Sequence, residues 1–273
     1  MNVQAAASVA VGFASGVLSG AFGIGGGLLT TPAITLLLGY PALIAVGTPL
    51  PVILPGALTG AAAYHRRGLA DVRAGLLMAA VGAAGSVGGA FLSRHIGGTG
   101  VLLATAVVIA GASIDMLLQH RAEGPARAVA GEGESDEGLA PAAAPAPAGP
   151  RTWTLVAIGV VAGLYSGFLG LGGGFVVVPA LTRWCGMPVK RAIGTSLVTV
   201  AALAIPGTLS HWYLGHIDWT LAALLAVGVV PGAVIGARLT GRASDRSVRL
   251  AFAVLLAVVG VWLAVSQLSG LRG

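Results

Sequence analysis

Residues 16–32 read GVLSGAFGIGGGLLTTP, and residues 163–179 read GLYSGFLGLGGGFVVVP. Six glycines and the final proline recur at the same places, 147 positions later in the chain. Two gapless copies of so specific a pattern indicate that the chain is one unit used twice. Four glycines within five residues interrupt a helix, so each half is expected to hold a helix break at the matching place.

The composition is that of a membrane protein. The 273 residues are 56% hydrophobic, with a mean hydropathy of +0.92, and only 9% are charged. Soluble domains carry about 25% charged residues. Several apolar runs exceed the ~18 residues that suggest a membrane-spanning helix, and they do not alternate as the strands of a β-barrel would. We therefore predict an all-α, multi-pass membrane protein.

The net charge of +6 does not indicate a nucleic-acid partner, because the arginines lie in short loops between apolar runs. That distribution is typical of cytoplasmic loops of membrane proteins. The N-terminal MNVQAAASVAVGF contains no Lys or Arg, so it lacks the charged region of a signal peptide and is expected to be retained. One cysteine, Cys185, cannot form an internal disulfide or a cysteine-rich metal site. No cofactor and no metal site are expected.

In the first half we expect a helix, a short arm and three spans, at 3–22, 28–38, 43–64, 72–92 and 101–118. The second half repeats this order at 152–169, 175–184, 192–210, 219–239 and 248–268. The first arm would reach only about 16 Å, half of the hydrocarbon core, so it is expected to be a half-helix that returns from the glycine break. The span that follows holds Pro49, Pro51 and Pro55 and is expected to be kinked or partly unwound.

Between the halves, residues 121–150 carry five acidic residues and the run PAAAPAPAGP, with almost no large apolar side chain. Such a segment cannot bury a core. The predicted organisation is a first transmembrane repeat at 1–120, a disordered linker at 121–150 and a second transmembrane repeat at 151–273.

The loops of the two halves carry opposite charge patterns. The loop around residues 39–42 has no positive residue, whereas its partner holds Arg183, Lys190 and Arg191. The next loop of the first half is rich in arginine, and its partner at 211–219 has none. Positive loops face the cytoplasm, so the halves are predicted to form an inverted-topology repeat, with a cytoplasmic linker and both termini outside. Inverted repeats with broken helices are typical of secondary transporters.

The glycine breaks predict an anion site. A glycine run that opens a half-helix exposes N–H groups without intrahelical partners, and the helix dipole adds positive charge there. Hydroxyl donors are expected from two matching Gly-Thr motifs, GTP at residues 47–49 and GTS at residues 194–196. The alternative is that the glycines only permit a tight turn and close packing. The candidate substrate-binding residues are Gly23, Gly25, Gly26, Gly27, Thr48, Gly170, Gly172, Gly173, Gly174, Thr195 and Ser196.

Other polar residues fit structural roles better than catalysis. Asp71 and Asp218 precede spans and are predicted to be helix N-caps. The five histidines all lie near span ends, and no nucleotide-binding loop of the G-x-x-x-x-G-K-[ST] type is present, so no enzyme centre is predicted. Asp115 could be a proton site or an interfacial residue. Coupling to a proton or to sodium is open.

The two glycine stretches, with VGTPL after the first and IGTSL after the second, resemble the TauE/SafE sulfite exporter family. The resemblance covers both halves outside the linker. It implies export, or at least transport, of small sulfur oxyanions and organosulfonates such as sulfite or sulfoacetate. The halves differ where Pro49 and Pro51 correspond to Ser196 and Val198, so the two half-sites are chemically unequal.

Together these features predict a secondary transporter of the bacterial inner membrane that exports a small sulfur-containing anion. The anion is expected to bind between the two glycine breaks, held by backbone N–H groups and Thr/Ser hydroxyls. One alternative is a transporter or channel for a different small solute or a metal ion. Another is a membrane scaffold that transports nothing.

Overall fold

The computed structural model describes the backbone of residues 3–128 and 152–270. Within those ranges the chain forms helices joined by short turns and contains no strand. The helices are α1 (Val3–Phe22), α2 (Gly27–Leu36), α3 (Ala42–Gly47), α4 (Pro49–His65), α5 (Val72–Ala128), α6 (Thr152–Leu169), α7 (Gly174–Trp184), α8 (Val189–Tyr213), α9 (Trp219–Arg242) and α10 (Asp245–Gly270).

Six helical segments of the described chain are long and apolar enough to cross a membrane, which confirms the multi-pass helical fold. They cover residues 3–22, 42–65, 72–96, 152–169, 189–213 and 219–242. The short arms α2 and α7 begin directly after the glycine breaks, as expected.

Prolines explain one difference between the halves. The second half has a single helix, α8, where the first half has α3 and α4 separated at Thr48. Pro49 and Pro51 have no N–H to donate to the preceding turn, so the helical hydrogen bonding is interrupted there. α8 carries Ser196 and Val198 at the matching positions and continues without a break.

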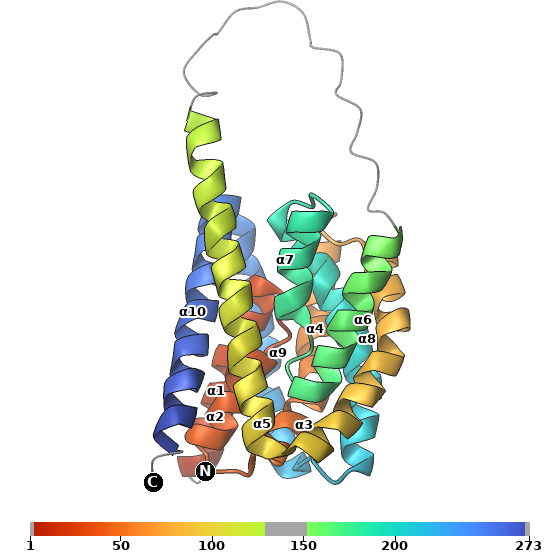
Figure 1. Ribbon diagram of the computed structural model, residues 1–273, viewed down its shortest axis with the longest axis vertical. Helices are drawn as coiled ribbons and strands as arrows, with labels where there is room; N and C mark the ends of the chain where they lie inside the picture. Colours follow the sequence, from red (N-terminus) through yellow and green to blue (C-terminus); the bar gives the residue numbers. More distant parts are fainter. Residues whose placement is uncertain (1–2, 129–151, 271–273) are drawn as a thin grey trace, which may run out of the picture.

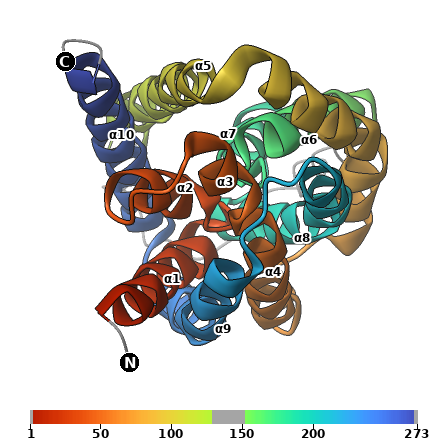
Figure 2. The same cartoon turned by 90° about the horizontal axis from the view of Figure 1, so that it is seen from below.

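The helix α5 is continuous between the two spans that the sequence predicts separately at 72–92 and 101–118. Figure 1 shows that α5 changes direction sharply at the bottom of the view, so that its two arms run in roughly opposite directions. Its second arm lies beside α10 at one edge of the molecule (Figure 2). α5 also continues to Ala128, inside the predicted linker, and the rest of that linker lies outside the described residues.

The two halves exchange equivalent contacts. α1 packs against α9 of the other half, and α6 packs against α5. A Cβ atom added at Gly16 would lie 2.3 Å from the Val229 oxygen, and one added at Gly163 would lie 1.9 Å from the Gly82 oxygen. Gly16 corresponds to Gly163, and Gly82 to Val229, at the same offset of 147. Such an exchange is what two units related by a two-fold axis produce, and glycine permits the close helix approach.

The two hairpins lie at opposite ends of the bundle. In Figure 1, the α1–α2 hairpin occupies the lower part of the molecule and α7 the upper part, with the breaks between them near the middle. The start of α1 and the end of α10 lie at the lower end. The end of α5 and the start of α6 lie at the upper end. The chain therefore brings its two glycine breaks together from opposite directions.

Candidate functional site

Each break is built from three glycines in the left-handed backbone region. Residues with a Cβ atom rarely adopt this conformation, which explains why glycine stands there. Gly26 and Gly173 are the N-cap residues of α2 and α7. The φ angles are +72° at Gly23, +77° at Gly25, +85° at Gly26, +65° at Gly170, +77° at Gly172 and +73° at Gly173.

The two breaks touch through their backbones. A Cβ atom added at Gly27 would lie 2.6 Å from the Leu171 Cα and 2.7 Å from the Gly170 oxygen. One added at Gly174 would lie 2.2 Å from the Gly23 oxygen. The structure thus brings all eight predicted break glycines into one buried region at the interface of the halves.

Several amide groups of the breaks have no partner in the described chain. The N–H groups of Gly25, Gly26, Gly172 and Gly173 donate to no carbonyl or side chain there. Buried N–H groups without acceptors are rare in native proteins, because leaving them unpaired costs free energy. They also stand at the N-terminal ends of α2 and α7, where the helix dipole is positive. The breaks are therefore equipped to receive an acceptor-rich, negatively charged group.

Two apolar side chains fill the space beside the breaks. The Val200 Cγ1 would lie 2.5 Å from a Cβ at Gly25 and 2.9 Å from a Cβ at Gly172. Ile53 approaches the same two glycines from α4. Both side chains are buried, so the breaks are closed off from solvent in this conformation.

The predicted hydroxyl donors separate into two groups. Ser196 Oγ donates to the Gly23 oxygen at 2.8 Å and so belongs to the first break. The Thr48 and Thr195 hydroxyls instead accept from the N–H groups of Asp218 and Asp71, at 3.1 and 2.9 Å. These two contacts are equivalent and cross between the halves. The two threonines therefore join the Gly-Thr motif of one half to the helix start of the other.

Asp71 and Asp218 are N-caps, as predicted. Asp71 Oδ1 accepts from the N–H of Ala74, and Asp218 Oδ1 accepts from the N–H of Leu221. Each aspartate therefore satisfies one of the free N–H groups in the first turn of its helix.

The sequence analysis missed four hydroxyl groups near the breaks. Ser15 Oγ donates to the Gly26 oxygen at 2.6 Å, and Thr30 Oγ1 donates to the same oxygen at 2.9 Å. Ser19 and Ser166 are fully buried, and their hydroxyls have no hydrogen-bond partner among the described residues. The last two occupy matching places in the duplicated stretches, a Ser-Gly pair just before each break, and that repetition was the available signal.

Tyr64 at the end of α4 and His211 near the end of α8 occupy matching positions in the two halves. Each contacts a backbone oxygen of the helix that precedes a break, α1 or α6. Tyr64 donates its hydroxyl to the Gly20 oxygen at 3.1 Å. In the second half, His211 Nε2 lies 2.8 Å from the Gly167 oxygen, and its Nδ1 lies 3.2 Å from His216 Nδ1. Since a carbonyl only accepts, His211 donates from Nε2 to the Gly167 oxygen.

The family model for the sulfite exporter TauE/SafE matches residues 8–263, from within α1 to within α10. The chain belongs to the sulfite exporter TauE/SafE family. This confirms the resemblance inferred from the two glycine stretches. No solved structure matches this TauE/SafE chain.

The relatives of this TauE/SafE protein are membrane transporters by name. It is 29% identical to a probable membrane transporter protein of Xylella fastidiosa (strain 9a5c), over 92% of this chain and 90% of that protein. It is 25% identical to the probable membrane transporter protein YunE of Bacillus subtilis, over 92% of this chain and 94% of that protein. With MamO of Magnetospirillum gryphiswaldense it shares 30% identity, over 91% of this chain but only 43% of that protein. The chain is thus a membrane transporter and not an enzyme.

Proposed function

We propose that this protein is a secondary transporter that exports a small sulfur oxyanion or organosulfonate, with sulfite as the first candidate. The observation that carries the proposal is the set of buried N–H groups at Gly25, Gly26, Gly172 and Gly173, which donate to nothing in the described chain. The oxygens of an oxyanion supply the acceptors that these donors lack. The substrate class is supported by the family to which the chain belongs.

The hydroxyls beside the breaks support the same ligand. Ser19 and Ser166 are buried without a partner in the part of the chain that the structure describes, one before each break, and each can donate one hydrogen bond to an anion. Ser196 lies close to the first break through its bond to the Gly23 oxygen. In this proposal Thr48 and Thr195 act by holding the interface between the halves, since their hydroxyls meet the aspartate N–H groups.

Direct contact between the breaks defines the state of the transporter. Because Gly27 and Gly174 pack on the backbone of the opposite break, an anion reaches the N–H groups only when the two breaks separate. We therefore assign this conformation to an occluded state. Separation towards one end and then the other, with the hairpins entering from opposite sides, provides alternating access.

The orientation follows from charge. Arg67, Lys190 and Arg242 line one pocket and so lie at the same end of the bundle. We assign this end to the cytoplasm of a bacterial inner membrane, since positive residues favour that side. The linker is then cytoplasmic and both termini lie outside.

The test is flux of labelled sulfite in liposomes that contain the purified protein, with sulfate, thiosulfate, sulfoacetate, taurine and chloride as competitors. Ser19→Ala and Ser166→Ala should each reduce transport about tenfold, the loss expected from one hydrogen bond to a charged group. Ser210→Ala is the matched control, because the Ser210 hydroxyl donates to the Pro206 oxygen of its own helix and to no other residue that the structure describes.

If the parent protein moves no sulfur anion, the proposed substrate is wrong. If the parent transports but both serine variants equal the control, the breaks do not hold the substrate. Imposing a proton gradient and a sodium gradient separately across the same liposomes identifies the coupling ion.

A further inference from the structure

A second basic site lies away from the glycine breaks. It is a pocket of about 520 Å³ formed by the loop after α4, the start of α8 and the end of α9. The pocket therefore draws on both halves of the chain. Its lining residues are Arg67, Leu69, Lys190, Arg238, Gly241 and Arg242.

The pocket carries more positive charge than its carboxylates neutralise. Lys190 Nζ lies 3.5 Å from Asp245 Oδ1, the one ion pair that a lining residue makes within the described chain. Arg238 and Arg242 form no ion pair with any described residue. Three arginines thus line one pocket without an acidic partner among the described residues, an arrangement that an anion stabilises.

The position of Arg67 indicates that the pocket is a specific arrangement and not a chance cluster of surface arginines. Arginines at the end of α9 are accounted for by the helix dipole and by the preference of positive charge for one side of the membrane. Arg67 comes from the other half and reaches over α9, where its Nη1 donates to the Ala237 oxygen at 3.0 Å. That bond uses one of the five guanidinium N–H groups, which leaves the others for a ligand.

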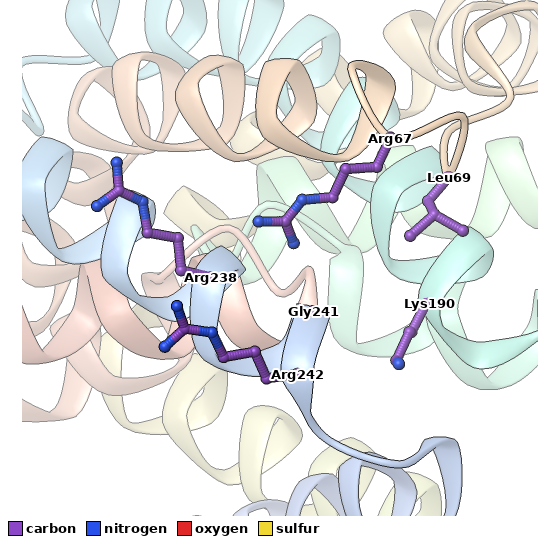
Figure 3. A pocket seen from close by; sticks show the side chains of 6 residues that line it. All are labelled: Arg67, Leu69, Lys190, Arg238, Gly241 and Arg242. Carbon is purple, nitrogen blue, oxygen red and sulfur yellow. The ribbon is translucent and has the colours of Figure 1, made fainter.

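Gly241 makes room for this guanidinium. A Cβ atom at Gly241 would lie 2.0 Å from Arg67 Nη1, so any side chain there would displace the arginine. Figure 3 shows Arg67 extending over α9 beside Gly241, with Arg238 and Arg242 on the same helix and Lys190 on the other side of the pocket.

The neighbours of the pocket residues hold the end of α1 just before the first break. Thr240, next to Gly241, donates its hydroxyl to the Ala21 oxygen at 2.9 Å. Tyr64, one turn before Arg67, donates to the Gly20 oxygen at 3.1 Å. The pocket is therefore bordered by residues that hold the end of α1, and the first break begins at Gly23, two residues after Ala21.

We infer that this pocket is a second oxyanion site, a vestibule that captures the substrate at the basic end and delivers it to the first break. The inference rests on the proposed function. The planar fork of arginine pairs with two oxygens of a sulfite or sulfonate group. A lipid phosphate offers the same oxygens, so the test must separate a soluble anion from a headgroup.

The experiment measures sulfite flux in phosphatidylcholine liposomes, with sulfite added at the basic end or at the opposite end of the inserted protein. For Arg238→Gln, the KM for sulfite added at the basic end should rise about tenfold, the loss of one charge-assisted hydrogen bond, with kcat within twofold of the parent. The KM for sulfite added at the opposite end should not change. Arg67→Gln should behave alike, and Arg73→Gln, an exposed arginine outside the pocket, should equal the parent.

The inference is overturned if the parent transports sulfite but Arg238→Gln leaves both KM values unchanged, or raises them equally from both ends. It is also overturned if Arg238→Gln differs from the parent only in liposomes that contain phosphatidylglycerol, because a lipid headgroup and not the free anion is then the ligand of the pocket. A parent protein that moves no sulfur anion rejects the proposed function instead. In that case, calorimetry of sulfite binding to the purified parent and to Arg238→Gln tests whether the pocket binds sulfite. The variant is expected to bind with a tenfold weaker Kd.

Discussion

The contact between the two breaks can be tested by one methyl group. Gly27 is the first residue of α2 and has ordinary helical geometry, so alanine causes no backbone strain there. The added Cβ would lie 2.6 Å from the Leu171 Cα and 2.7 Å from the Gly170 oxygen. Any effect of Gly27→Ala therefore reports on the approach of the second break to the first.

The magnitude follows from two opposing effects. Forcing a methyl group into a closely packed region costs about 1–3 kcal/mol. Alanine in place of glycine gains up to about 1 kcal/mol of helix propensity. We therefore expect Gly27→Ala to lower the free energy of unfolding by about 1–2 kcal/mol. It should also slow transport, because the added methyl group keeps the two breaks from meeting in the occluded state.

The matched control is Gly88→Ala in α5, where the added Cβ meets nothing within 4 Å. That substitution should stabilise the protein by about 0.5–1 kcal/mol and leave transport unchanged. Thermal unfolding of both variants in detergent, with sulfite flux in liposomes, provides the comparison. If Gly27→Ala is as stable as Gly88→Ala and transports at the parent rate, the breaks do not meet as described.

Three further predictions concern single side chains. Ser196→Ala removes the donor to the Gly23 oxygen and should cost about 1 kcal/mol in thermal unfolding, with slower sulfite flux. Burial lowers the pKa of His216 below its ordinary value, and the Arg94 cation lowers it further, so the folded state disfavours the protonated ring. The unfolded chain takes up that proton below about pH 6.5. The midpoint temperature of thermal unfolding should therefore decrease when the pH is lowered from 7.5 to 5.5, and it should decrease less in His216→Gln. Asp218→Ala should lower the free energy of unfolding by about 1 kcal/mol, because it removes the cap of α9. Asp218→Asn should retain most of the stability that the cap contributes, and denaturation curves of both variants measure the difference.

Local patterns were enough to predict the helices and the breaks. Apolar runs place the spans, and clustered glycines mark positions where only a residue without a Cβ fits. The caps at Asp71 and Asp218 follow from their place before apolar runs. In contrast, the sequence suggested that the helix ends around Gly97, Gly98 and Gly100, whereas α5 stays helical there while the chain reverses its direction.

Long-range partners could not be predicted from the same patterns. The Thr48 hydroxyl meets Asp218 from the other half, a contact that only the packing of the two halves decides. Arg67 reads as an ordinary loop arginine in the sequence, and its placement over Gly241 depends on how α4 and α9 cross. The repeated Ser-Gly pair marks Ser19 and Ser166 in the sequence, but their lack of hydrogen-bond partners among the described residues depends on the packing.

The central claim is that glycine N–H groups hold the anion, and the most direct test is NMR of protein labelled with 15N-glycine during titration with sulfite. A hydrogen bond to an anion should shift the amide protons of Gly25, Gly26, Gly172 and Gly173 downfield, with one common Kd. Gly39 and Gly186, left-handed glycines with open surroundings, should not move. Saturable shifts confined to the break glycines would support the account. Sulfite binding that leaves these four amides unchanged would contradict it.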